Sequence, residues 1–221
     1  MGYQSTQPAS DGRFRALDVR VNRPGVIVRT RRGYWRESAK ELEKRKRATP
    51  EAAALAGLLP KGDLPMQMVA MPLAIPGRKE SAVTMVINVR QPIADPSRRT
   101  IERVDLQVVA FNTDGKAFGA KRLLTDVTIR AGARGVAEYE VLSRLDLKPG
   151  RYQIRVGGHV GRLSTSGSLY YDVDVPDYRS QALSLSALAL AVAPPLVAGG
   201  AEAIREVLPI VPTAQRQFGP D

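Results

Sequence analysis

The strongest constraint on the fold is a series of short segments in which apolar and polar residues alternate. Alternation with a period of two is typical of strands that bury one face against a core. Turn-forming residues separate these segments roughly every 8–12 residues, which is characteristic of an antiparallel β-sandwich. We therefore predict a mostly β protein with strands over residues 65–73, 82–90, 103–111, 122–129, 136–142, 151–158 and 168–175.

The sixth predicted strand begins with a tyrosine that directly follows a turn. Pro149 and Gly150 form this turn, and Tyr152 opens a strand whose apolar residues continue at every second position. The arrangement resembles the tyrosine corner of β-sandwiches, in which the tyrosine hydroxyl bonds to backbone a few residues upstream. We expect Tyr152 to be buried, with its hydroxyl bonded near Leu145–Leu147. Pro149, Gly150 and Tyr152 then have structural roles in an immunoglobulin/fibronectin-III-like sandwich.

The remaining segments have less regular patterns. Two apolar runs flank the turn-forming Asn22–Gly25, which predicts a β-hairpin with arginines on one face. The following residues are polar and favour helix, and Thr49 and Pro50 form a typical helix start. The expected organisation is a hairpin over 1–35, a basic helical linker over 36–62, the sandwich over 63–191 and a C-terminal tail over 192–221, the tail opening a truncated further segment.

The positive charge is concentrated before the sandwich. The formal net charge is +11, and residues 11–47 contain 13 Lys or Arg and 5 Asp or Glu, a balance of +8. Such a segment can bind nucleic acid or an anionic surface. Its glutamates also suit pairing on a solvated helix surface, so we favour a solvated face and keep anionic binding as the alternative. That alternative would use Arg29, Arg31, Arg32, Lys44, Arg45, Lys46 and Arg47.

Few residues suit catalysis or metal binding. His159 is the single histidine, and the chain has no cysteine to complete a zinc site with it. The glycines around it lack the Lys-Ser/Thr of a phosphate-binding loop. Asp172 and Asp174 alternate on a predicted strand and lack the glycine-containing ligand loop of a calcium site. The sequence therefore predicts no catalytic, cofactor or metal site, and a protein that is not an enzyme.

Neither a signal peptide nor a membrane span is predicted. The chain does not open with the basic and apolar regions of a signal peptide. Its most apolar run, residues 182–198, includes two serines and a Pro-Pro pair. It is shorter than the roughly 20 apolar residues that a membrane helix needs.

The N-terminal region resembles the end of the von Willebrand factor A (VWFA) domain in bacterial VWFA-related proteins of the acidobacterial type. The resemblance rests on Asp11–Arg15, Arg23–Gly25 and Arg31–Trp35, in this order. Four shorter blocks are similar to the β-rich region that follows this domain: Leu147–Tyr152, Ile154–Val156, Val175–Tyr178 and Leu183–Ser186. Pro212–Phe218 is similar to the opening of a further segment.

The resemblance implies a non-enzymatic interaction or structural module of an exported protein. The expected setting is extracytoplasmic, periplasmic or secreted, and the expected partner is a protein or a cell-envelope component. The family binds a metal through an Asp-x-Ser-x-Ser motif, which this chain lacks, so no metal ligand is transferred to any residue. The chain would be the C-terminal part of such a protein, and truncation would explain the missing signal peptide. The alternative is nucleic-acid or anionic-surface binding through residues 13–47, with nucleic acid the less favoured partner.

Overall fold

The computed structural model divides the chain into two compact units, Met1–Thr49 and Pro50–Asp221. The residues that it describes are 11–20, 22, 33–35, 38–40, 43, 48–57, 59–130, 135–180, 183–192 and 197–216. In the first unit, β1 (Phe14–Ala16) pairs antiparallel with β2 (Gly33–Trp35). This pairing falls within the predicted hairpin over 1–35, but residues 17–20 form no strand, and most of the predicted turn lies outside the described residues.

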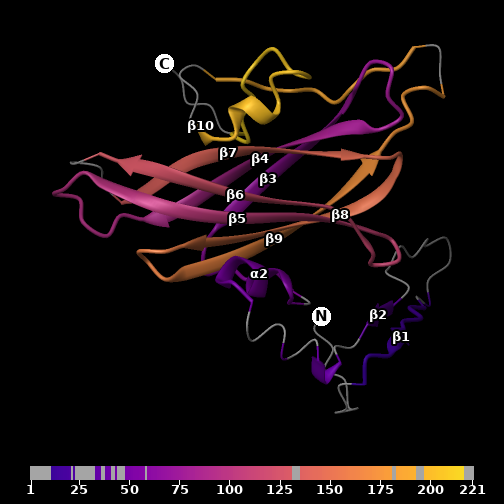
Figure 1. Ribbon diagram of the computed structural model, residues 1–221, viewed down its shortest axis with the longest axis horizontal. Coiled ribbons are helices and arrows are strands. Elements are labelled where there is room, and N and C mark those ends of the chain that lie inside the picture. The colour runs from indigo at the N-terminus through magenta and orange to yellow at the C-terminus, as the bar shows by residue number, and fades with distance from the viewer. Residues whose placement is uncertain are drawn as a thin grey trace. The chain divides into compact units, whose positions relative to one another are not determined.

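The second unit contains two four-stranded sheets (Figure 1). One sheet has the order β10-β7-β4-β3 and the other β6-β5-β8-β9, and every pair is antiparallel except β10 with β7. The mostly β antiparallel fold predicted from the sequence is thus confirmed, and all seven predicted strands form. The strands are β3 (Met66–Ala74), β4 (Ser81–Pro92), β5 (Thr100–Asn112), β6 (Ala117–Ile129), β7 (Val136–Leu147), β8 (Gly150–Val160), β9 (Thr165–Val175) and β10 (Val197–Gly199).

The main hydrophobic core lies between the two sheets. Met85 and Ile87 of β4 are fully buried in it, together with Leu106 and Val108 of β5 and Ile154 of β8. Burial of each large apolar side chain stabilises the fold by roughly 1.5–3 kcal/mol. The alternation that predicted these strands therefore reflects one face of each strand packed against the opposite sheet.

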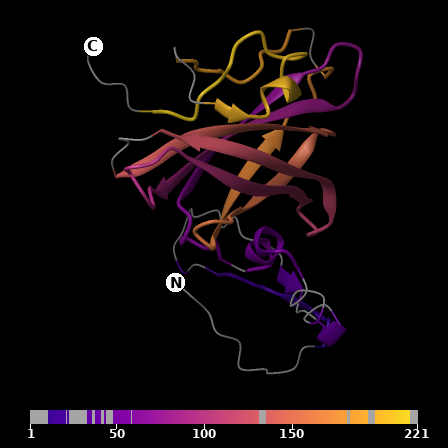
Figure 2. The same ribbon diagram turned by 60° about the vertical axis from the view of Figure 1, so that its left-hand side comes forward.

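A second, smaller core lies on the outer face of the sheet β10-β7-β4-β3. Val86 and Leu142 of this face pack with Ile204 and Ala214 of the C-terminal segment, which also contains the short 3-10 helix η1 (Ala201–Ala203). With this cover, β4 is buried on both faces. Residues 197–216, expected within a C-terminal tail, therefore pack on the sandwich. In both views they lie on the opposite side from helix α2 (Figures 1 and 2).

Helix α2 (Pro50–Leu55) packs on the outer face of the other sheet, although we expected these residues in a linker. Gly157 of β8 makes this contact possible. A Cβ on Gly157 would collide with the Glu51 carbonyl oxygen and lie 2.8 Å from Leu55 Cγ. A Cβ on Gly158 would lie 2.9 Å from Met66 Sδ inside the core. Gly157 and Gly158 thus both lie within β8, where each admits a closely packed neighbour.

The predicted tyrosine corner forms at the start of β8. Tyr152 is 7% exposed, and its hydroxyl donates a hydrogen bond to the Lys148 carbonyl oxygen at 3.0 Å. Burial is confirmed, and the acceptor lies one residue beyond the expected Leu145–Leu147. Gly150 has a φ of +151°, a conformation that favours glycine. The turn through Pro149 and Gly150 therefore fixes how the chain passes from β7 in one sheet to β8 in the other.

Candidate functional site

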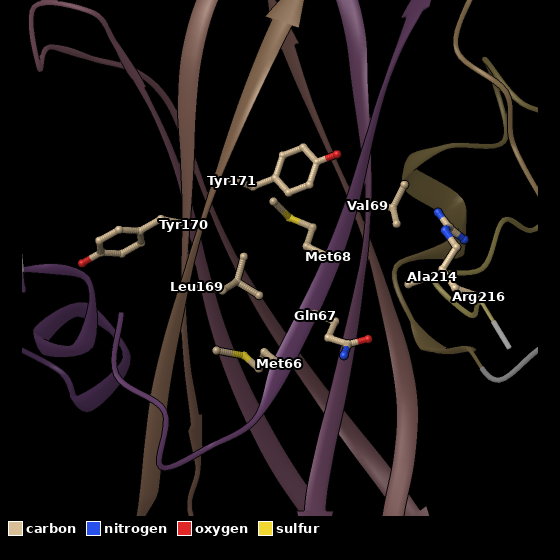
Figure 3. Close-up of a pocket in the computed structure, with 9 residues that line it drawn as sticks. All are labelled: Met66, Gln67, Met68, Val69, Leu169, Tyr170, Tyr171, Ala214 and Arg216. Atoms are coloured by element: carbon tan, nitrogen blue, oxygen red, sulfur yellow. The ribbon is translucent and has the colours of Figure 1, made fainter. Parts of the chain in front are cut away.

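The candidate site is a groove between β3 and β9, the outer strands at one side of the two sheets. It has a volume of about 410 Å³, and its lining includes Met66, Met68, Leu169, Tyr171 and Arg216. Figure 3 shows Met68 and Tyr171 pointing toward one another between the two strands, while Tyr170 points away. The Tyr170 hydroxyl instead donates to the Gly57 carbonyl oxygen, just after α2. The groove therefore combines the apolar side chains of Met66, Met68 and Leu169 with polar groups, among them those of Gln67 and Arg216.

The free edge of β3 borders this groove. The Arg90 amide donates to the Pro65 carbonyl oxygen at 3.0 Å, and the register between β3 and β4 continues without a bulge. In antiparallel sheets, hydrogen-bonded pairs alternate with pairs that do not bond. Counting from Pro65, the amide and carbonyl groups of Met66, Met68 and Ala70 point away from β4.

Pro72 lies on the same edge and supports this orientation. Its carbonyl oxygen accepts a hydrogen bond from the Tyr178 hydroxyl at 2.7 Å and from the Ala187 amide at 3.5 Å. Proline within a sheet is confined to such edges, because it has no amide hydrogen for the ladder. Within the described ranges, the outward amide and carbonyl groups of Met66, Met68 and Ala70 have no hydrogen-bond partner.

Cationic side chains surround the groove but already have partners. Arg216 Nη1 donates to the Gln215 carbonyl oxygen at 2.7 Å. Lys61 and Arg90 line an adjoining depression of about 300 Å³. Lys61 Nζ lies 3.1 Å from Asp63, and Arg90 Nε lies 3.8 Å from Glu138. The groove therefore lies beside backbone groups of β3 that have no partner among the described residues, and the charges of its cations are already engaged, an arrangement suited to an uncharged extended segment.

The residues that the sequence singled out are not part of this groove. Tyr152, Pro149 and Gly150 build the corner between β7 and β8. The seven basic residues of the anionic-binding alternative lie outside the described residues: Arg29, Arg31, Arg32, Lys44, Arg45, Lys46 and Arg47. One signal for the groove was present in the sequence. A proline in a predicted strand, here Pro72, indicates an edge strand.

A row of three cross-strand neighbours brings Asp105, His159 and Ser166 together. His159 Nδ1 lies 3.0 Å from Ser166 Oγ, and Asp105 is the register partner of His159 on β5. A nucleophile–base–acid relay requires the acid to orient the histidine. In the part of the chain that the structure describes, no hydrogen bond joins Asp105 to His159. Arg122 Nη2 instead donates to Asp105 at 3.2 Å, so this row lacks the geometry of such a relay.

The aspartates considered as calcium ligands have other partners on the sheet surface. Asp172 accepts a hydrogen bond from Gln153 Nε2 at 3.0 Å, and Asp174 pairs with Arg151 at 2.9 Å. Among the described residues, no group of three His, Cys, Asp or Glu side chains is arranged to hold a metal ion. These aspartates therefore take part in cross-strand contacts of β8 with β9.

Buried polar side chains gather at one end of the main core. The Tyr139 hydroxyl donates to Gln91 Oε1 at 2.7 Å, and burial raises the pKa of Tyr139, with a smaller contribution from the charge of Glu102. Gln91 Nε2 and Glu102 Oε2 are buried without a hydrogen-bond partner among the described residues. Arg162 is the ion-pair partner of Glu102, at 3.5 Å.

None of the helices in the described ranges is both long enough and apolar enough to cross a membrane. No protein-family model matches the chain, and no curated protein matches it.

Similarity to solved structures is low. A Bacteroides uniformis beta-glucuronidase matches with 11% identity and a TM-score of 0.35, over 50% of this chain and 13% of that chain. A target of the Northeast Structural Genomics Consortium matches with 8% identity and a TM-score of 0.36, over 57% and 95%. CsgH from R. palustris matches with 15% identity and a TM-score of 0.24, over 49% and 91%. The chain thus spans about 13% of the first glucuronidase, and likeness at this level carries no argument about function.

Proposed function

We propose that this chain is a non-enzymatic interaction module that binds an extended peptide as an added strand along β3. The observation that carries the proposal is the row of outward backbone groups at Met66, Met68 and Ala70, which lie beside the groove and have no partner among the described residues. In strand addition, main-chain hydrogen bonds supply affinity, and pockets for alternate side chains supply specificity. The groove lined by Met68, Leu169 and Tyr171 would receive every second side chain of the bound segment.

The proposed setting is an exported VWFA-related protein, acting outside the cytoplasm on a protein or cell-envelope partner. The N-terminal likeness at Asp11–Arg15 and Arg31–Trp35 supports this setting. The strand order also supports placing the sandwich in the immunoglobulin or fibronectin type III class. Strands β3, β4 and β7 face β6, β5, β8 and β9, and Tyr152 lies near the start of the next-to-last strand of these seven.

The test uses a peptide library displayed on phage and selected on the whole chain. Ala70→Pro removes one outward amide from the edge and leaves the amides that bond to β4 unchanged, and Pro72 shows that this edge accepts proline. We expect selected peptides to bind Ala70→Pro at least about tenfold more weakly, since one lost hydrogen bond and the added ring together cost about 1.4 kcal/mol.

Ala70→Ser is the matched control, because it keeps the amide and should bind the selected peptides like the wild type. Melting temperatures of the two variants check that the fold is intact. Equal affinity of Ala70→Pro and Ala70→Ser for every selected peptide would refute strand addition at β3.

The second candidate function is binding to nucleic acid or an anionic surface, favoured by the local charge of +8 over residues 11–47. Its test is a salt titration with duplex DNA and with anionic vesicles. A steep loss of binding with salt is expected from counterion release. Binding should disappear on neutralising Arg29, Arg31, Arg32, Lys44, Arg45, Lys46 and Arg47. Binding that persists in this variant would exclude the basic segment as the site.

A further inference from the structure

An extended segment that follows β9 exposes several large apolar side chains. Leu183, Leu185 and Leu188 are 80%, 87% and 84% exposed, so three large apolar side chains within six residues lie in contact with solvent. The segment Leu183–Leu190 belongs to no strand of either sheet. From Ser180 to Ala201 the sequence contains no charged residue. An uncharged segment with exposed leucines is suited to burial against another surface.

The segment is attached to the sandwich on both sides. Before it, the Tyr178 hydroxyl donates to the Pro72 carbonyl oxygen at 2.7 Å. At its end, the Thr213 amide donates to the Leu190 carbonyl oxygen at 2.8 Å, and Ala191 forms a bridge with Pro212. A segment held extended in this way loses little conformational entropy when it binds, which favours affinity.

These attachments also keep the segment out of the groove of its own chain. The Ala187 amide reaches the Pro72 carbonyl oxygen at 3.5 Å, at the end of β3 beyond Met66, Met68 and Ala70. To run along these three residues, the segment would have to give up its bonds at Tyr178 and Leu190. The exposed segment therefore lies next to the edge of β3 but does not pair with Met66, Met68 or Ala70.

We propose that Leu183–Leu190 of one copy of this chain adds as a strand to β3 in the groove of a second copy. The proposal rests on the proposed strand-addition function and names its occupant. A surface that carries both the segment and the groove is self-complementary, so two copies related by a two-fold axis bury both segments at once. The cations around the groove have partners already, which suits the uncharged sequence of this segment.

The experiment measures association of the whole chain by sedimentation over a concentration series. The donor variant Leu185→Asp/Leu188→Asp changes two exposed side chains, and the acceptor variant Ala70→Pro changes the edge of β3. We expect each to raise the dimer dissociation constant at least about tenfold. Leu124→Asp, at a leucine that is 62% exposed on β6, is the matched control and should associate like the wild type.

A synthetic peptide with the sequence of residues 183–190 separates this proposal from the proposed function. We expect the peptide to bind the donor variant, whose groove is intact, and to bind Ala70→Pro much more weakly. A monomeric wild-type chain that does not bind the peptide, while library peptides still require the Ala70 amide, would overturn self-association and leave strand addition standing. Failure of both the peptide and the library would overturn both.

Discussion

The close contact between helix α2 and β8 makes Gly157→Ala the sharpest test of how the second unit is packed. The added Cβ would collide with the Glu51 carbonyl oxygen and lie 2.8 Å from Leu55 Cγ. The backbone of α2 must then shift, because a carbonyl group cannot rotate away as a flexible side chain would. The single methyl group added at residue 157 therefore either shifts helix α2 or displaces it from the sheet.

Two limits bound the cost of this substitution. If the helix shifts and remains attached, overpacking costs about 1–3 kcal/mol. If it leaves the sheet, burial of Leu55 and Ala54 is lost, which costs roughly 2–4 kcal/mol for one leucine and one alanine. We expect a loss of about 2–3 kcal/mol in the free energy of unfolding. This corresponds to a fall of roughly 4–12 °C in melting temperature for a domain of this size.

The assay is urea unfolding followed by circular dichroism, with Gly161→Ala as the matched control. A Cβ on Gly161 would meet no atom within 4 Å. Both substitutions also restrict the unfolded chain, which stabilises by about 0.4–1 kcal/mol, so the difference between them isolates the helix contact. If both variants unfold within about 0.5 kcal/mol of each other, α2 does not rest on Gly157 and the packing described above is wrong.

Three further predictions follow from buried polar groups. Tyr152→Phe should lower the free energy of unfolding by about 0.5–1.5 kcal/mol, the net contribution of one hydrogen bond, and an unchanged melting point would argue against the tyrosine corner. Glu140 Oε1 accepts hydrogen bonds from Thr213 Oγ1 and the Ala214 amide, each at 2.7 Å. Glu140→Ala should therefore lower the free energy of unfolding in urea by about 1–3 kcal/mol, whereas Glu140→Gln, which keeps an acceptor oxygen, should be close to wild type. Equal destabilisation by the two variants would contradict these hydrogen bonds. Burial raises the pKa of Tyr139 above its value in the unfolded chain. The stability that Tyr139 contributes is therefore full below about pH 10 and falls by up to about 1.4 kcal/mol per pH unit above pH 10. Between pH 9 and 11 the melting temperature should fall less steeply for Tyr139→Phe than for the wild type, and identical slopes would refute the effect of burial.

The strands could be predicted because their alternation is a local property of the sequence. The predicted end of β7 was nevertheless too early. Leu145 and Leu147 continue the alternation and are buried, so the strand extends to Leu147 rather than to residue 142. The tyrosine corner was predicted for the same reason, since Pro149, Gly150 and Tyr152 are close together in the chain.

The groove could not be predicted in this way, and neither could the packing of helix α2 on one sheet or of residues 197–216 on the other. Gly157 contacts a helix about a hundred residues earlier in the chain, and no local pattern records that contact. Whether the amides of Met66 and Met68 face outward depends on the register with β4, which the side-chain pattern alone does not set. The helix of α2 was recognised from Pro50, but not the sheet on which it packs.

The cover on the outer face of β4 has a consequence for how the protein is synthesised. Val86 and Leu142 leave the ribosome well before Ile204 and Ala214, the residues that pack over them. Until then the nascent chain carries a sheet with one apolar face open to water. Residues 197–216 therefore complete this smaller core, and a shortened chain that ends near residue 191 is expected to aggregate through that face.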